Sequence, residues 1–379
     1  MRKFWIQFHR ISGLILLVPL LLQSISGSII VFDHAIDEWL NPSLIVTHLP
    51  KEKLAALPLI RAATINALPD IDYIKSLRAP RNQHAAYTAF VQMKKTSPLY
   101  AKKMEIMIHP YTAEVLSIRE WGSYFTSFIY LFHYTFLLGH NAELTLGFLA
   151  ILMLVNVFVG IYYGWPRSTK AWKWLVAKNQ KITPTVGRLR RAHMLAGLIS
   201  LPVFTVVIIS GISLIFPNQT KWLLDRPAKL NPPIQQQNNP SVDEDLWLKS
   251  AKNYWPDKQW QRINFPTQQR PAVEIRLTDA SDPRKTSGSN MLWIDPYTNE
   301  VIAQQSYQPL TVRQKTAFWL FPLHNGEAFG LTGRIIIFIS GLLTTLLSIA
   351  GGWLWYKRKF RPQRNQQQQK TMKLNLKEP

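Results

Sequence analysis

Four stretches of the chain constrain its fold most, because they contain no Asp, Glu, Lys or Arg and are long enough to cross a membrane. They cover residues 11–32, 144–165, 194–216 and 335–356 of the 379-residue sequence. A helix needs about 20 apolar residues to cross a hydrocarbon core about 30 Å thick, and it satisfies its own backbone hydrogen bonds there. The sequence therefore predicts four transmembrane helices, with a long polar segment after the first and another after the third.

The distribution of basic residues predicts the orientation of these helices. The chain carries 44 Lys and Arg against 22 Asp and Glu, a net charge of +22. Basic residues concentrate at the N-terminus, in the loop over residues 167–191 and in the tail after residue 357. Short cytoplasmic flanks of membrane helices are enriched in Lys and Arg, so we expect both termini inside and both long segments outside. The charge is then explained by topology, and we predict no nucleic-acid binding.

The first and third apolar stretches repeat one another, as do the second and the fourth. In the first comparison the matched residues are 184 positions apart: His9 and His193, Gly13 and Gly197, Gly27 and Gly211, Phe32 and Phe216. In the second they are 191 apart: His133 and His324, Gly139 and Gly330, Gly160 and Gly351, Arg167 and Arg358. We therefore predict an internal two-fold repeat with both halves in the same orientation.

The two exterior segments also resemble each other. Residues 107–115 (MIHPYTAEV) match residues 293–301 (WIDPYTNEV), and the shared Pro-Tyr-Thr-x-Glu-Val is typical of a turn that joins two strands. Residues 87–93 and 272–277 alternate as strands do, and residues 51–68 and 242–254 have helical spacing. Each exterior segment is thus predicted to form a small α+β domain of a helix and a hairpin.

These observations predict a membrane α-helical fold with two small exterior domains. The expected bounds are helix 1 over 1–34, exterior domain 1 over 35–122, an interfacial helix and helix 2 over 123–166, a basic cytoplasmic loop over 167–191, helix 3 over 192–217, exterior domain 2 over 218–314, an interfacial segment and helix 4 over 315–357, and a disordered cytoplasmic tail over 358–379.

Four repeated histidines are the candidate ligands of a cofactor. His9 and His193 occupy the cytoplasmic ends of the first and third helices, and His133 and His324 precede the second and fourth near their outer ends. Two neutral imidazoles are the axial ligands of a b-type haem, and facing helices can hold the porphyrin. The chain has no cysteine that could supply a thiolate instead. We predict that His9 and His193 bind one haem, and His133 and His324 a second.

Other interpretations of these residues remain open. A histidine near a membrane surface can be satisfied by solvent or lipid headgroups, and Gly13 and Gly197 fit close helix packing as well as the approach of a flat ring. His140 lies 184 residues before His324 and is an alternative to His133 as its partner. The His140-x-x-Glu143 spacing would also suit a non-haem metal site.

The sequence has no Gly-x-Gly-x-x-Gly dinucleotide loop, no phosphate loop and no His-Glu-x-x-His or Gly-x-Ser-x-Gly motif. A redox protein of this design would therefore take electrons from an external donor. The sequence does not identify that donor, and a homodimer remains open.

Several motifs resemble the PepSY-associated transmembrane family, in particular the bacterial inner-membrane siderophore reductases. They are Trp5-x-x-x-His9-Arg-x-x-Gly13, Asn41-Pro42, Phe132-His133 with Leu137-Leu-Gly139, Trp165-Pro-Arg167, Arg190-x-x-His193-x-x-x-Gly197, and Leu323-His-x-Gly326-Glu-x-Phe-Gly330-Leu-x-Gly-Arg334. The resemblance covers nearly the whole chain except the tail.

The resemblance implies a haem-containing inner-membrane protein whose two PepSY-like domains are periplasmic. Its implied activity is the reduction of ferric iron held by a siderophore, and its partners are that ferric siderophore, membrane lipid and the electron donor. Because Fe(II) is softer and less charged than Fe(III), reduction weakens the hold of hard oxygen ligands. Some members of the family are only associated with peptidases. The alternative is therefore a non-enzymatic protein that binds or regulates a peptidase or a sensor.

Overall fold

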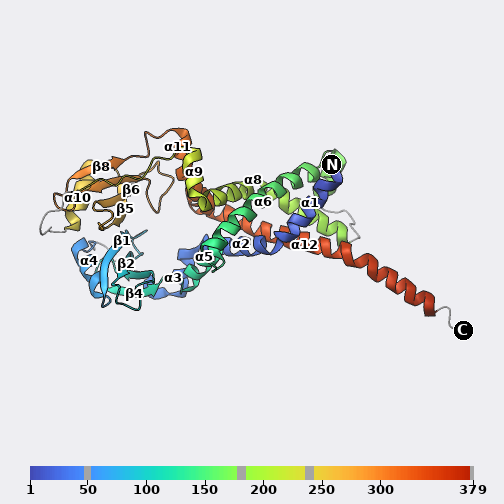
Figure 1. Cartoon of the computed structure of the whole chain (residues 1–379), viewed down its shortest axis with the longest axis horizontal. Helices are drawn as coiled ribbons and strands as arrows, with labels where there is room; N and C mark the ends of the chain where they lie inside the picture. The colour runs from blue at the N-terminus through green and yellow to red at the C-terminus, as the bar shows by residue number, and fades with distance from the viewer. Residues whose placement is uncertain (47–52, 177–184, 235–242, 376–379) are drawn as a thin grey trace. The chain divides into compact units, whose positions relative to one another are not determined.

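The computed structural model describes residues 1–46, 53–176, 185–234 and 243–375. The chain divides into two compact units (Figure 1). The helical unit comprises residues 1–31, 132–216 and 332–379, and the sheet unit comprises residues 32–131 and 217–331.

The helical unit contains the elements that could cross a membrane. Its helices are α1 (Arg2–Ile15), α2 (Leu17–Ile30), α6 (His140–Gly164), α7 (Thr169–Val176), α8 (Thr185–Ile215) and α12 (Gly330–Asn375). Within the described residues, three segments are long and apolar enough to span: His140–Gly164, Val186–Ile215 and Glu327–Phe360. The bent pair of α1 and α2 makes a fourth if it is one span. The prediction of apolar helices that could span a membrane is confirmed by their length and composition.

The first apolar stretch differs from the third in its shape. The axes of α1 and α2 meet at 57°, with the break at Leu16. Pro19 lies three residues beyond the break, lacks the N–H that would donate to the Ile15 carbonyl, and crowds that carbonyl with its ring. The helix α8 also contains a proline, Pro202, yet runs without a break from Thr185 to Ile215.

Apolar contacts and small polar side chains hold the helical unit together. Helix α6 packs against both α1 and α8 (Figure 1). The core between these helices is formed by Leu16, Met153, Phe204 and Ile208. The Ser24 hydroxyl on α2 lies 2.9 Å from that of Thr345 on α12. Close approach of small residues is the usual way in which helices associate in lipid.

The last helix extends beyond the predicted end of the fourth apolar stretch. Helix α12 continues through residues 358–375 to Asn375. This segment contains Pro362, but it is rich in Gln, Lys and Arg, which have high helix propensity. Of the expected cytoplasmic loop over 167–191, residues 177–184 lie outside the described part.

The sheet unit consists of one antiparallel sheet with helices around it. The strands are β1 (Ile71–Arg78), β2 (Tyr87–Met93), β3 (Met104–Ile108), β4 (Val115–Glu120), β5 (Gln259–Asn264), β6 (Val273–Thr278), β7 (Asn290–Ile294) and β8 (Val301–Gln305). Their order is β4-β3-β2-β1-β5-β6-β7-β8. The helices are α3 (Asp33–Leu40), α4 (Leu57–Asn66), most of α5 (Phe125–Thr135), α9 (Pro217–Leu224), α10 (Glu244–Tyr254) and α11 (Val312–Asn325), with the short turns η1 (Pro42–Leu44) and η2 (Glu327–Phe329).

One face of the sheet packs against α4 and α10 to form the main core. Alternate residues of the central strands point into it, including Leu77, Ala89, Ile106, Ile263 and Ile275. Trp247 of α10 is fully buried in the same core. The opposite face therefore carries the other half of each strand's side chains.

The strand and turn predictions in the two exterior segments are largely confirmed. Strand β2 has the expected bounds, and β6 is offset by one residue. The Pro-Tyr-Thr motifs form matching turns: Ala113 and Asn299 both have a φ of 61°. In each turn the backbone N–H of the residue before the proline donates across the loop, from His109 to the Glu114 carbonyl and from Asp295 to the Glu300 carbonyl.

The two exterior segments do not form separate sheets. Each contributes one packed helix and four strands, as an α+β domain would, but β1 pairs with β5 so that both segments share one sheet. The pairing joins Ser76 to Asn264, Leu77 to Ile263 and Arg78 to Arg262. The hairpin patterns missed β1 and β5, which pair with β2 and β6 as well as with each other.

Candidate functional site

His9 lies on α1 with its ring against α6. Its Nδ1 is 3.1 Å from the carbonyl oxygen of Asn156. A Cβ added at Gly160 would lie 2.8 Å from the His9 Cε1. Because an α-helix has 3.6 residues per turn, the side chain of residue i+4 lies beside the carbonyl of residue i on the same face of the helix. The missing side chain at Gly160 thus lets the imidazole reach the Asn156 carbonyl.

His193 has the same environment on a different pair of helices. It lies on α8, and its Nδ1 is 3.0 Å from the carbonyl oxygen of Leu347 on α12. A Cβ at Gly351, four residues after Leu347, would lie 3.1 Å from the ring Cε1 and Nδ1. Both contacts follow the offsets of the sequence comparison, 184 residues for the histidines and 191 for the carbonyl and glycine positions.

These hydrogen bonds assign the tautomer of both rings. A backbone carbonyl only accepts, so each Nδ1 carries the proton and donates it. In the neutral ring Nε2 then holds a lone pair. Neither His9 nor His193 has a hydrogen bond at Nε2 to any residue in the described part of the chain. Metal-bound histidines commonly have this arrangement, one ring N–H on a carbonyl and the other nitrogen on the metal.

The structure brings the two rings together. Their centroids are 6.4 Å apart and their planes meet at 77°. An imidazole nitrogen binds a transition metal at about 2 Å and lies about 1.2 Å from its ring centre, so two imidazoles on opposite sides of one metal have centres about 6 to 6.5 Å apart. The spacing of the His9 and His193 rings and the tautomer of each would therefore suit two ligands of one haem iron.

The two half-sites differ at one position. Asn156 is 4% exposed, and its side-chain Oδ1 is buried without a hydrogen-bond partner. The corresponding residue on α12 is the apolar Leu347. A Cβ at Gly13 would meet the Asn156 side chain at 3.5 Å, and one at Gly197 would meet that of Leu347 at 3.2 Å. Gly13 and Gly197 thus permit close helix packing, which was one of the two interpretations of these glycines from the sequence. The other was the approach of a flat ring.

His133 lies near the end of α5 and contacts α2. Its Nδ1 is 2.9 Å from the Ser26 hydroxyl, and its carbonyl accepts a hydrogen bond of 2.6 Å from the Gln23 amide. A Cβ at Gly27 would lie 3.0 Å from the ring Cε1. His133 is therefore held on a glycine, as His9 and His193 are, although its Nδ1 meets a hydroxyl rather than a carbonyl.

His140 and His324 lie in different settings. His140 begins α6, is exposed, and its Nδ1 lies 3.1 Å from the Glu143 carboxylate. His324 is in the last turn of α11 and belongs to the sheet unit, whereas His133 belongs to the helical unit. Within the described residues, no group of three or more His, Cys, Asp or Glu side chains is placed to hold a metal ion. The His-x-x-Glu pair at residues 140–143 thus has no third ligand there.

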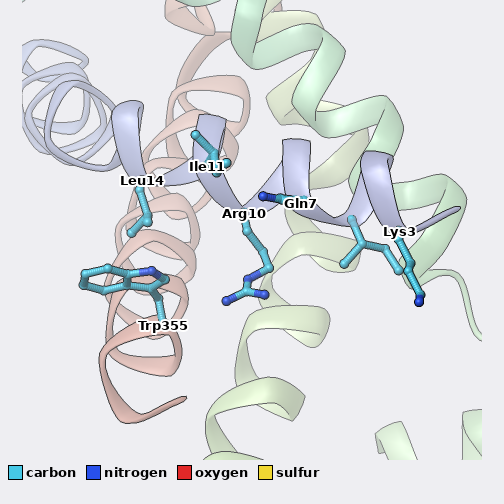
Figure 2. A pocket seen from close by; sticks show the side chains of 7 residues that line it. Lys3, Gln7, Arg10, Ile11, Leu14 and Trp355 are labelled. Atoms are coloured by element: carbon cyan, nitrogen blue, oxygen red, sulfur yellow. The ribbon is translucent and has the colours of Figure 1, made fainter. Parts of the chain in front are cut away.

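A groove of about 370 Å³ lies along α1 on the turn next to His9. It is lined by Lys3, Ile6, Gln7, Arg10, Ile11, Leu14 and Trp355. Figure 2 shows Lys3, Gln7 and Arg10 along α1, with the Trp355 ring of α12 below Leu14. Its cations and apolar floor suit the headgroup region of a membrane.

The sequence analysis identified the histidines as candidate ligands, but it did not identify the carbonyls and glycines that position their rings. On each of these helices a residue whose carbonyl accepts the hydrogen bond is followed four positions later by a glycine: Asn156 and Gly160 on α6, and Leu347 and Gly351 on α12. The two glycines were visible only as markers of the repeat. A glycine four residues after a residue on an apolar helix face is the signal that could have identified these contacts.

A comparison with curated proteins finds no match. A comparison with protein-family models finds the PepSY-associated TM region, which matches residues 6–186, 190–313 and 303–358. These segments cover residues 6–358 except 187–189, and they include both His9 and His193 and the strands of the sheet unit. The chain therefore belongs to the PepSY-associated transmembrane family.

Proposed function

We propose that the protein is an inner-membrane, haem-containing reductase that passes electrons to a ferric siderophore on the periplasmic side. The observation that carries the proposal is the pair His9 and His193, with rings 6.4 Å apart and each Nδ1–H on a helix carbonyl. Bound haem would supply a one-electron Fe(III)/Fe(II) couple at this site. The external donor loses one electron for each ferric ion that is released as Fe(II).

The chain's own residues have defined parts in this proposal. His9 and His193 would hold the haem iron through Nε2, and the carbonyls of Asn156 and Leu347 fix the orientation of both rings. Gly160 and Gly351 leave the space in which the rings lie. The buried apolar side chains of Leu16 and Met153 belong to the core of the same helical unit.

A second haem bound by His133 and His324 completes the proposed electron path. The support is the sequence offset of 191 residues and the contact of His133 with Gly27, which parallels that of the inner histidines. Ser26-Gly27 recurs as Ser210-Gly211, so each half of the chain carries the same elements. His140 is the weaker alternative because it is exposed and paired with Glu143.

The proposed topology has both termini in the cytoplasm and the two exterior segments, as PepSY-like domains, in the periplasm. The two halves are repeats of each other. The matched half-sites, the matching turns after β3 and β7, and the strand order, which mirrors about the β1–β5 pair, support this reading.

The reductase activity is tested with purified protein in lipid nanodiscs. The haem is reduced with one equivalent of dithionite without oxygen, and a ferric siderophore is then added. We expect the haem absorbance to return to its oxidised form while a ferrous chelator detects Fe(II) in equal amount. Reduced haem that persists with every ferric siderophore would contradict the reductase. A colourless, fully folded protein would favour the alternative of a non-enzymatic partner of a peptidase or sensor.

A further inference from the structure

Three arginines form a row across the middle of the sheet. Arg78 on β1 is directly opposite Arg262 on β5, and Arg262 is directly opposite Arg276 on β6. Their neighbours Leu77, Ile263 and Ile275 point into the core with α4 and α10, so the arginine row lies on the other face. Like charges directly opposite on neighbouring strands are destabilising. Folding alone does not explain two such pairs side by side.

Among the described residues, Arg276 is the member of the arginine row that forms an ion pair. The Nε of Arg276 donates to the Glu274 carboxylate at 2.9 Å, and Glu274 also pairs with Lys229. Arg78 and Arg262 form no ion pair with any described residue, and the Nε of each is buried without a hydrogen-bond partner. Both side chains are partly buried, and a partly buried cation without an ion pair favours the approach of an anion to its accessible N–H groups.

The electrostatics of the row agree with its geometry. Burial, followed by repulsion from Arg78 and Arg276, lowers the pKa of Arg262 to about 9. Burial also lowers the pKa of Arg78. Arg284, in the loop after β6, has its pKa lowered to about 10 by burial and then by repulsion from Arg226 and Arg276. The positive charge therefore extends beyond the row itself.

Acidic residues near this face are already engaged. Glu105 accepts a hydrogen bond from the Tyr124 hydroxyl at 2.7 Å and lies 3.7 Å from Arg119. Asp282 accepts from both the backbone and the hydroxyl of Ser289. Beside the row, Arg78 and Lys103 lie over the Phe90 ring at 5.1 and 5.0 Å. The face thus combines surplus positive charge with an aromatic ring.

We propose that the arginine row binds an anionic ferric chelate, one whose iron is held by carboxylate or catecholate oxygens, in preference to a neutral hydroxamate chelate. This specificity rests on the proposed reductase function, for which it names the substrate class. Guanidinium groups present paired N–H donors that match carboxylate and catecholate oxygens. Arg78 and Arg262 would donate to the chelate, and Arg276 stays with Glu274.

The test uses gallium(III) complexes, which have the shape and charge of the ferric ones but are not reduced. The full chain in nanodiscs is titrated with an anionic gallium tris-catecholate and a neutral gallium tris-hydroxamate. We expect the anionic complex to bind at least about tenfold more tightly, with an affinity that falls as salt rises. Equal affinity for the two complexes would overturn the proposal. Displacement of the catecholate complex by an equal concentration of inorganic phosphate would also overturn it, since the row would then be a general anion site.

Variants assign the binding to the row. We expect Arg78→Gln and Arg262→Gln each to weaken binding of the anionic complex about tenfold, and Arg262→Lys to retain most of it. The exposed Arg270 supplies the control, because Arg270→Gln removes the same charge from a turn of the same unit. Both row variants should unfold at a higher temperature than wild type, since they remove repulsion. Wild-type affinity in both would overturn the proposal, and binding of gallium is measured whether or not the protein proves to reduce iron.

Discussion

The half-site around His9 and the half-site around His193 are built alike from different sequences. In both, Nδ1 donates to a helix carbonyl, and a glycine four residues further on leaves room for the ring. The residues that supply the carbonyls differ: Asn156 is polar and Leu347 is apolar. The α1–α2 pair is bent whereas α8 is continuous. The shared features are therefore those that orient an imidazole, and side-chain identity at the carbonyl position is free to vary.

We expect the largest loss of haem from substitutions of Gly160 and Gly351, the glycines against which the His9 and His193 rings lie. In Gly160→Leu or Gly351→Leu the new side chain occupies the space of the imidazole, since even a Cβ would lie 2.8 or 3.1 Å from it. We expect each variant to lose most of the inner haem, measured as absorbance per protein. Gly164→Leu is the control, because nothing lies within 4 Å of a Cβ at that position on the same helix. Full haem content in both core variants would show that the glycines do not position the rings.

The outer histidines extend the comparison to a third environment. His133 rests on Gly27, and His140 is exposed beside Glu143. We expect His133→Ala to remove about one haem of the proposed two, and His140→Ala to retain both. The haem content of the purified variants, by the pyridine haemochrome method, separates the two. Loss of haem in His140→Ala alone would assign the outer ligand to His140.

We expect the smallest effect on haem content from a change at Asn156, the position at which the two half-sites differ. Asn156→Leu makes the first half-site like the second and removes a buried Oδ1 that has no partner. We expect the haem content to be unchanged and the protein to be stabilised by about 1 kcal/mol, since a buried unpaired polar group costs about 1 to 3 kcal/mol. Thermal unfolding in detergent measures the change. A large loss of haem would instead give the Asn156 side chain a direct part in binding.

Local patterns predicted those parts of the fold that depend on nearby residues. The apolar stretches indicated the long helices, and the Pro-Tyr-Thr motifs indicated turns that the structure contains at residues 110–112 and 296–298. The break at Leu16 could have been expected from Pro19, although Pro202 shows that proline alone does not decide it. The pairing of β1 with β5 joins residues almost 190 positions apart, and no short pattern in either strand specifies it.

The same limit applies to the candidate sites. Repetition singled out His9 and His193, because a polar residue that recurs on an apolar helix stands out in the sequence. The carbonyl partners are invisible there, since every residue has a carbonyl and only the packing of α6 and α12 selects Asn156 and Leu347. Arg78 and Arg262 were also missed. They become a row only when the sheet register places them opposite each other.

The most direct test of the account is the haem content of His9→Ala and His193→Ala beside wild type. The purified proteins are compared by their oxidised and dithionite-reduced spectra. His84→Ala is the matched control: its Nδ1 also lies 3.0 Å from a carbonyl, that of Val46, but its Nε2 is engaged by Gln83. We expect a b-type haem spectrum in wild type and in His84→Ala, and loss of the same haem in both His9→Ala and His193→Ala. Unchanged spectra in these two variants would contradict it.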